Sequence, residues 1–121
     1  MFSVASNNVI TITRGDSASF VLYLNKGTKL EPSRFVLGDN DAVYMGIMEA
    51  NQRFEDAIVK FKFTKENLNQ DGDIKIKLKA TDTEYLEPDK YFYQIKLVYI
   101  DDDDDEQVNT VIDRTEFFVQ E

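Results

Sequence analysis

The densest run of chemically capable residues is acidic. Aspartates occupy every position from Asp101 to Asp105, and Glu106 follows. Calcium takes about six to eight oxygen ligands, and EF-hand loops space their carboxylates at alternate positions around a glycine. This run has neither the spacing nor the glycine, and neighbouring like charges repel. We therefore predict a solvated loop, with weak adventitious cation binding as the alternative.

Lysines recur at alternate positions of two expected strands. Lys60 and Lys62 share one face, and so do Lys75, Lys77 and Lys79. If these strands pair, like charges crowd one sheet face, which destabilises a sheet. The cluster is either a solvated face that resists aggregation or a docking surface for an acidic partner. The candidate assembly surface consists of Lys60, Lys62, Lys75, Lys77, Lys79, Asp101, Asp102, Asp103, Asp104 and Asp105.

The sequence lacks the residues of the common catalytic sites. It contains no histidine and no cysteine. Zinc sites of the usual kind, Ser-His-Asp triads and Cys-His pairs all depend on one or both. Carboxylates, lysines and tyrosines remain, and acid–base work would demand strongly shifted pKa values from them. We predict a protein that is not an enzyme, with no catalytic residue, metal site or cofactor.

Two short motifs have both a structural and a functional interpretation. Arg14-Gly15-Asp16 matches an integrin-binding tripeptide, but a tight turn between antiparallel strands is the preferred interpretation. Asp71-Gly72-Asp73 is similarly expected to be a hairpin turn rather than a set of metal ligands.

Four tyrosines could form an aromatic platform for a sugar. Tyr91, Tyr93 and Tyr99 share the inward face of one expected strand, and Tyr85 precedes it. Because alternate residues of a strand face the same side, we expect core packing with hydroxyl groups at the rim.

Length and composition predict one soluble globular domain. The chain has 121 residues, 42% hydrophobic and 31% charged, with a net charge of −9. We assign residues 1–121 to a single β-sandwich domain, with residues 1–8 as a flexible arm. The acidic balance argues against nucleic-acid and anionic-membrane partners. The first ten residues lack the basic start and apolar core of a signal peptide, so we expect folding in a cytoplasm.

Alternation of apolar and polar residues with a period of two predicts strands along most of the chain. Asn25-Lys26-Gly27 is expected to be a turn, and Thr28 to Asp41 an irregular connection with at most a short strand at Phe35-Val36-Leu37. Thr81 and Glu84 have capping-box spacing, which predicts one helical turn with Tyr85 or Leu86 beneath it. The expected strands cover residues 9–14, 17–24, 43–48, 59–64, 73–79, 91–99 and 108–119.

Seven short strands and a single helical turn indicate an all-β fold. Adjacent antiparallel pairs and a long connection after the second strand favour a Greek-key, Ig-like sandwich, with an open barrel as the alternative. A polar segment ending in Asp71-Gly72 is expected to join the two lysine-bearing strands as a hairpin. The predicted core includes Phe20, Leu22, Phe61, Phe63, Ile74, Ile76, Tyr93, Ile95, Leu97 and Phe117.

Several of these segments together resemble a known family. The residues that carry the resemblance are Arg14-Gly15-Asp16, Asp41 before Val43-Tyr44-Met45, Lys60 to Thr64, Asp73 to Lys79, Asp82-Thr83 with Leu86 and Tyr91-Phe92-Tyr93-Gln94-Ile95, and Thr110-Val111 with Phe117-Phe118-Val119. Across roughly residues 9–120 the chain is similar to the Ig-like domain at the N-terminus of bacteriophage baseplate upper proteins, and to related small tail or neck proteins. That family usually has glycine just before its Tyr-x-Tyr strand, where this chain has Lys90.

The resemblance implies a virion structural protein that acts by assembly. Its partners would be other copies of itself or other virion proteins, in a homo-oligomer, within the virion and in the host cytoplasm during assembly. It brings no catalytic residues. A carbohydrate- or peptide-binding module is the alternative function. We also consider a head-to-tail contact between the acidic run of one copy and the lysines of the next.

Overall fold

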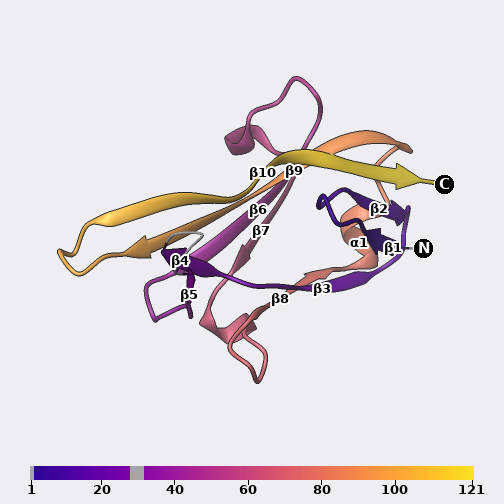
Figure 1. Cartoon of the computed structure of the whole chain (residues 1–121). Helices are drawn as coiled ribbons and strands as arrows, with labels where there is room; N and C mark the ends of the chain where they lie inside the picture. Colours follow the sequence, from indigo (N-terminus) through magenta and orange to yellow (C-terminus); the bar gives the residue numbers. More distant parts are fainter. Residues whose placement is uncertain (1, 28–31) are drawn as a thin grey trace.

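The chain folds mostly as β-structure, as the alternation predicted (Figure 1). The computed structural model describes residues 2–27 and 32–121. Two 3₁₀ turns, η1 (Phe54–Asp56) and η2 (Lys65–Asn67), and a one-turn helix, α1 (Ala80–Thr83), lie between strands. The described strands are β1 (Phe2–Val4), β2 (Ile10–Thr13), β3 (Ala18–Leu22), β4 (Asn25–Gly27), β5 (Pro32–Arg34), β6 (Ala42–Met48), β7 (Val59–Phe63), β8 (Ile74–Leu78), β9 (Asp89–Ile100) and β10 (Glu106–Gln120).

Six strands form one curled sheet, called here the large sheet, in the order β1-β2-β10-β9-β6-β7. Its neighbours pair antiparallel except for β2 and β10, which run parallel with Ile10 opposite Phe117. The prediction of wholly antiparallel pairing is wrong at this point. No hairpin links β2 to β10, so turn geometry does not set their relative direction. Parallel pairing places buried Ile10 and Ile12 beside buried Phe117 and Val119.

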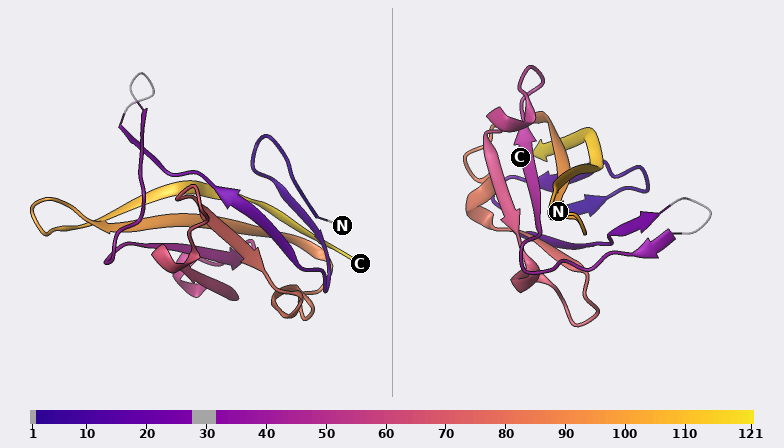
Figure 2. Two further views of the ribbon diagram at one scale, coloured as in Figure 1. Left: turned by 90° about the horizontal axis from the view of Figure 1, so that it is seen from below. Right: turned by 90° about the vertical axis from the view of Figure 1, so that its left-hand side faces the viewer.

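Two strands, β3 and β8, form the small sheet, and β4 pairs with β5 in a separate ribbon (Figure 2). Asn25–Gly27 is therefore a strand rather than the expected turn. The short strand of the following connection is Pro32–Arg34, immediately before the position that the sequence suggested. Residues 28–31 of that connection lie outside the described part of the chain. Within the expected N-terminal arm, Phe2–Val4 pairs with β2.

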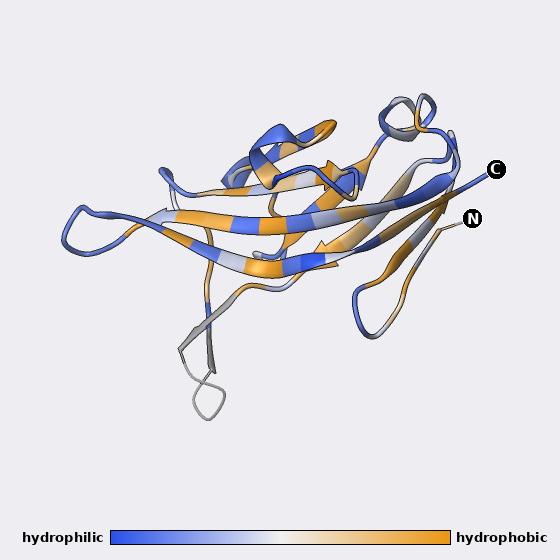
Figure 3. Ribbon diagram, turned by 90° about the horizontal axis from the view of Figure 1, so that it is seen from above, coloured by the Kyte–Doolittle hydropathy of each residue, from blue (hydrophilic) through white to orange (hydrophobic). Residues whose placement is uncertain are grey.

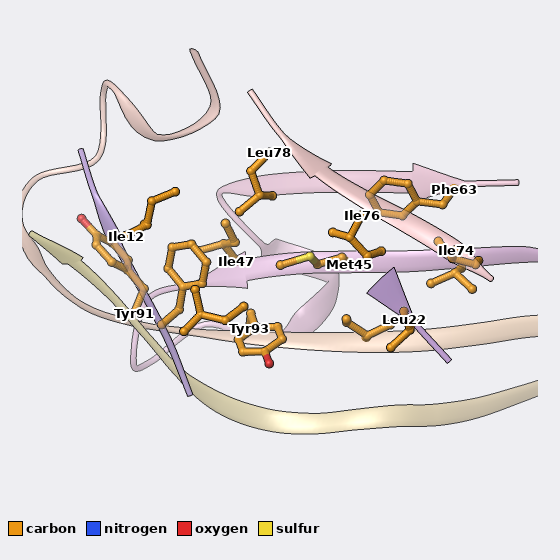
Figure 4. Close-up of a cluster of buried hydrophobic side chains, with 14 of the residues drawn as sticks. Ile12, Leu22, Met45, Ile47, Phe63, Ile74, Ile76, Leu78, Tyr91 and Tyr93 are labelled. Atoms are coloured by element: carbon orange, nitrogen blue, oxygen red, sulfur yellow. The ribbon is translucent and has the colours of Figure 1, made fainter. Parts of the chain in front are cut away.

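The hydrophobic core draws its side chains from both sheets (Figure 4). Of the predicted core residues, Phe20 and Phe61 are partly buried and pack against the core, while the other members are buried. The central strand β6 is covered on both faces, as its composition indicated. Inward and outward residues alternate along β9 from Tyr91, whereas in β10 regular alternation is confined to its last residues, after the register shifts on both sides of Ile112 (Figure 3).

The corner between β8 and β9 differs in register from the predicted helical turn. Its first residue is Ala80, and the Asp82 carboxylate accepts a hydrogen bond from the Lys79 backbone N–H at 2.6 Å. Lys79 is the N-cap residue and Thr81 lies inside the helical turn, so its predicted capping role is wrong. The chain turns directly after buried Leu78, which moves the helix start ahead of Thr81.

Leu86 and Tyr91 stabilise this corner, the first by burial and the second by a hydrogen bond. Leu86 is buried, as one of the two residues proposed to lie beneath the helical turn, whereas Tyr85 is 85% exposed. The hydroxyl of Tyr91, near the start of β9, donates a hydrogen bond to the carbonyl oxygen of Glu87 at 2.7 Å. This hydrogen bond connects the start of β9 to the segment between α1 and β9.

Candidate assembly surfaces

The predicted cluster of five lysines is divided between the two sheets. Lys60 and Lys62 lie on β7, which pairs with β6 in the large sheet. Lys75 and Lys77 lie on β8, which pairs with β3 in the small sheet, and Lys79 follows. The hairpin expected between β7 and β8 does not form. Instead η2 and a tight turn carry the chain across, because β8 is the strand that completes the small sheet over the core.

The chain turns at Gly72, as predicted, although not within a hairpin of β7 and β8, and hydrogen bonds build this turn. Gly72 has a φ of +81°, a region that favours glycine. The Asn69 side-chain oxygen accepts the backbone N–H groups of Asp71 and Asp73 at 2.9 and 3.0 Å. The Asp73 carboxylate pairs with Arg34 at 3.0 Å. The carboxylate of Asp73 is therefore held by a guanidinium within the fold.

Lys60 and Lys62 already have partners within the large sheet. The Lys60 ammonium donates a hydrogen bond to the Glu55 carbonyl at 2.8 Å, and the Lys62 ammonium lies 5.8 Å from the Tyr44 ring centre. A hollow of about 250 Å³ lies beside Lys60. It is bordered by the Phe54 ring, which covers Gly46 so closely that a Cβ there would lie 3.2 Å from the ring.

The outer surface of the small sheet, called here the basic face, carries the other three lysines. It consists of Ser17, Ser19, Val21, Tyr23, Lys75, Lys77 and Lys79. In the strand register, Ser19 lies opposite Lys77 and Val21 opposite Lys75. The opposite side of β8 contributes only buried apolar residues. Among the described side chains, these three lysines form no ion pair, so the basic face presents uncompensated positive charge.

The surface beside Lys77 is hollowed on both sides. A shallow depression of about 480 Å³ lies between Ser17 and Lys79, and a second of about 200 Å³ separates β8 from η2. Glu66 lines the second depression beside Lys75 and Lys77, and at the other end of the face the Asp82 carboxylate accepts the Lys79 backbone N–H at 2.6 Å. The lysine side chains therefore stand on a ridge between two recesses.

The acidic run forms the tip of the long β9–β10 hairpin. The Asp101 carboxylate accepts hydrogen bonds from the backbone N–H groups of Asp103 and Asp105, each at 2.9 Å, and from the Gln107 side chain at 2.9 Å. The bond from Asp105, helped by those from Gln107 and Asp103, holds the pKa of Asp101 below its usual value against slight desolvation. Asp101 therefore acts inside the loop, as its organising acceptor.

The remaining aspartates of the tip face solvent. Asp102, Asp103, Asp104 and Asp105 are exposed, and within the described residues their carboxylates form no ion pair. We call these four residues the acidic tip. No cluster of acidic side chains in the described ranges has the arrangement of a metal site. Figure 1 places the tip at the far end of the β9–β10 hairpin, away from β3 and β8, so the two charged surfaces do not meet within one chain.

The tyrosines of β9 point inward rather than forming a platform. Tyr91 and Tyr93 are buried, and Tyr99 packs against Phe35 with ring centres 5.3 Å apart. The Tyr93 hydroxyl donates a hydrogen bond to the Asn8 carbonyl, and burial raises its pKa to about 12. The prediction of core packing is confirmed for these three side chains.

The Arg14-Gly15-Asp16 segment is a tight turn, as predicted, but the strands that it joins, β2 and β3, belong to different sheets and do not pair with each other. Gly15 has a φ of +83°, and its N–H donates to the Thr83 hydroxyl oxygen at 3.1 Å. The Arg14 guanidinium pairs with Glu121 at 2.9 Å and lies 3.9 Å from Glu87. The arginine of the tripeptide is therefore engaged with acidic groups of its own chain.

Sequence reasoning missed Arg114, a residue of β10 that contacts both β9 and the segment after β6. Its guanidinium lies 4.7 Å from the Phe92 ring centre. It also donates to the carbonyl groups of Glu49, Ala50 and Gln52, each at 2.9 Å. Register shifts in β10 on both sides of Ile112 release Arg114 from the regular ladder. The break in alternation at Asp113-Arg114 is the only sequence feature that could have indicated it.

The described residues contain no helix with the length and apolar character needed to span a membrane. No known family matches this chain, and no curated protein or solved structure is significantly similar to it.

Proposed function

We propose that this chain is a non-enzymatic structural component of a bacteriophage tail, neck or baseplate, built as a Greek-key, Ig-like sandwich and acting through protein–protein assembly. The observation that carries the proposal is the corner at Tyr91. A tyrosine near the start of a late strand, bonded to backbone a few residues upstream, is a mark of Ig-like sandwiches. The Tyr91 bond to Glu87 has this form. It lies in the stretch Asp82 to Ile95, one of the segments that carry the family resemblance.

The path of the chain between sheets supports the same architecture. β3 belongs to the small sheet, β6 and β7 to the large sheet, β8 to the small sheet, and β9 and β10 to the large sheet. Such repeated crossing between two layers is what Greek-key connections produce. The parallel pair places β2, an early strand of the chain, beside the last strand β10 without changing this order.

The surface of the chain supports assembly rather than chemistry. The sequence has no histidine or cysteine to supply a base or thiol near neutral pH. The tyrosine hydroxyls of β9 with raised pKa values, Tyr91 and Tyr93, bond to backbone carbonyls. In contrast, the basic face and the acidic tip both carry exposed, unpaired charge that a protein partner could use.

The proposal is tested on particles from the strain that carries the gene. Lysates are fractionated on a density gradient, and the chain is quantified by peptide mass spectrometry in the particle band and in the soluble fractions. We expect it in the particle band at a fixed ratio to the other tail proteins. Absence from that band, with the chain found only in soluble fractions, would contradict a role in the virion.

A further inference from the structure

We propose that the basic face of one copy receives the acidic tip of a second copy, in a head-to-tail contact. This inference rests on the proposed assembly function and names its partner. The contact pairs Lys75, Lys77 and Lys79 with carboxylates of residues 102–105. Because the structure divides the five lysines, Lys60 and Lys62 have no part in it.

Charge complementarity is the first argument for this partner. The chain carries a net charge of −9, yet the described outer surface of the small sheet presents three lysines that form no ion pair. The acidic tip presents four carboxylates that also form none. In each chain the two sets lie on different parts of the molecule (Figure 1). A second copy supplies the complementary surface without requiring any other protein.

Spacing is the second argument. Alternate residues of a strand lie about 6.7 Å apart, so the three lysines span about 13 Å along β8. The tip is a tight turn closed by a hydrogen bond from the Asp101 backbone N–H to the Asp105 carbonyl at 2.9 Å, and its four remaining aspartates are exposed. The Asp101 side chain fixes the turn before binding, which reduces the ordering cost on contact. A narrow turn of this size can lie along one strand of the small sheet.

Apolar groups beside both charged sets supply the remaining contact area. Tyr23 is 67% exposed on the basic face, and Val21 lies beside it. Behind the tip, Val108 is 56% exposed, and Ile100 on the neighbouring strand is also exposed. Exposed ion pairs contribute little each, so they set register while apolar burial contributes affinity. The basic face and the hairpin end that carries the acidic tip each combine charged side chains with exposed apolar side chains.

The geometry makes the contact heterologous, because one copy uses two different surfaces. Such contacts extend into filaments or close into rings. Two variants test this directly. The tip variant changes Asp102, Asp103, Asp104 and Asp105 to Asn and keeps Asp101, which holds the loop. The face variant changes Lys75, Lys77 and Lys79 to Gln. A control variant, Lys60→Gln with Lys62→Gln, changes lysines on the other sheet.

Sedimentation velocity at concentrations up to about 1 mM, with each variant's fold checked by thermal unfolding, gives the readout. We expect wild type and control to associate beyond dimers, and each of the other two variants alone to remain monomeric, with apparent affinity reduced at least about tenfold. A mixture of the tip and face variants should form a 1:1 dimer that does not extend, since only one productive contact remains.

Three results would overturn the inference: a monomeric wild type throughout this range, a face or tip variant that assembles like wild type, or a mixture that yields no dimer. If the chain is nevertheless found in the particle band, the virion role stands and only the self-contact is wrong. Its basic face would then be assigned to a different acidic virion protein.

Discussion

The Thr83 hydroxyl oxygen accepts a hydrogen bond from the Gly15 N–H at 3.1 Å, and it joins two corners that are far apart in sequence. Gly15 lies in the turn between β2 and β3, and Thr83 ends α1. Thr83 is 0% exposed, so water cannot replace this partner. The turn that resembles an integrin motif is therefore a structural joint between the two sheets.

Replacing Thr83 should lower the free energy of unfolding, because it removes this hydrogen bond between the two corners. Thr83→Ala leaves the half-buried Gly15 N–H without this partner, and we expect a loss of about 1–2 kcal/mol in the free energy of unfolding. Thr81→Ala, two residues away but exposed, should change it by less than about 0.5 kcal/mol. Urea unfolding of both variants provides the measurement. Equal losses would indicate that Thr81 caps α1 after all.

The bond between Tyr91 and Glu87 should stabilise the β8–β9 corner. Tyr91→Phe removes the hydroxyl and keeps the ring, so we expect a loss of about 0.5–1.5 kcal/mol. Tyr85→Phe is the matched control, because Tyr85 is exposed on the same corner. Chemical unfolding compares the two. An unchanged stability for Tyr91→Phe would remove the main support for the Ig-like assignment.

The raised pKa of Tyr93 predicts that the free energy of unfolding falls at alkaline pH. Its pKa is about 12 in the folded chain, while an unfolded tyrosine has a pKa near 10. The stabilising contribution is therefore complete below pH 10, and it is lost as pH rises from 10 through 12, because the unfolded chain releases its proton first. The full difference corresponds to about 3 kcal/mol.

The variant Tyr93→Phe isolates this effect. It loses the bond to Asn8, so it should be less stable than wild type at neutral pH. Its free energy of unfolding should then fall less between pH 9 and pH 11.5, so the gap between the two proteins narrows. A gap that stays constant across this range would show that Tyr93 does not titrate as its burial implies.

Arg114 should hold the segment that follows β6. Arg114→Ala removes three bonds to carbonyl groups and the contact with Phe92, and we expect a loss of about 1–2 kcal/mol because the site is exposed. Arg53→Ala, in the segment itself and without such contacts among the described residues, is the control. Hydrogen exchange of residues 49–56 should accelerate in the first variant alone. Unaltered exchange there would contradict this positioning role.

Local pattern was sufficient to predict the seven longer strands and most of the core, but not the short strands β1, β4 and β5, and not the pairing partners of the strands. Alternation places Ile74 and Ile76 inward and Lys75 and Lys77 outward, and the structure agrees. Pairing depends on which sheet needs a strand, and that is a property of the whole chain. Nearness in sequence suggested that β7 and β8 form a hairpin, whereas β8 pairs with β3.

The charged surfaces were also predicted only in part from local pattern. The acidic run was predicted as an exposed loop from its repelling charges, and Asp102 to Asp105 are exposed. The inward role of Asp101 depends on the backbone of the turn, which composition does not encode. Similarly, Arg114 acquires its partners through register shifts in β10 and a segment some 60 residues earlier in the chain. The contacts of Asp101 and Arg114 depend on strand pairing and register, which local sequence pattern does not specify.

The most direct test of the account is zero-length crosslinking between lysines and carboxylates in a mixture of unlabelled and ¹⁵N-labelled chains. The account predicts crosslinks from Lys75, Lys77 or Lys79 to residues 102–105 that join one labelled and one unlabelled peptide. Lys60 and Lys62 should give none to these residues. Crosslinks confined to chains of one isotope, or equally frequent from both lysine sets, would contradict a contact between the basic face and the acidic tip of a second copy.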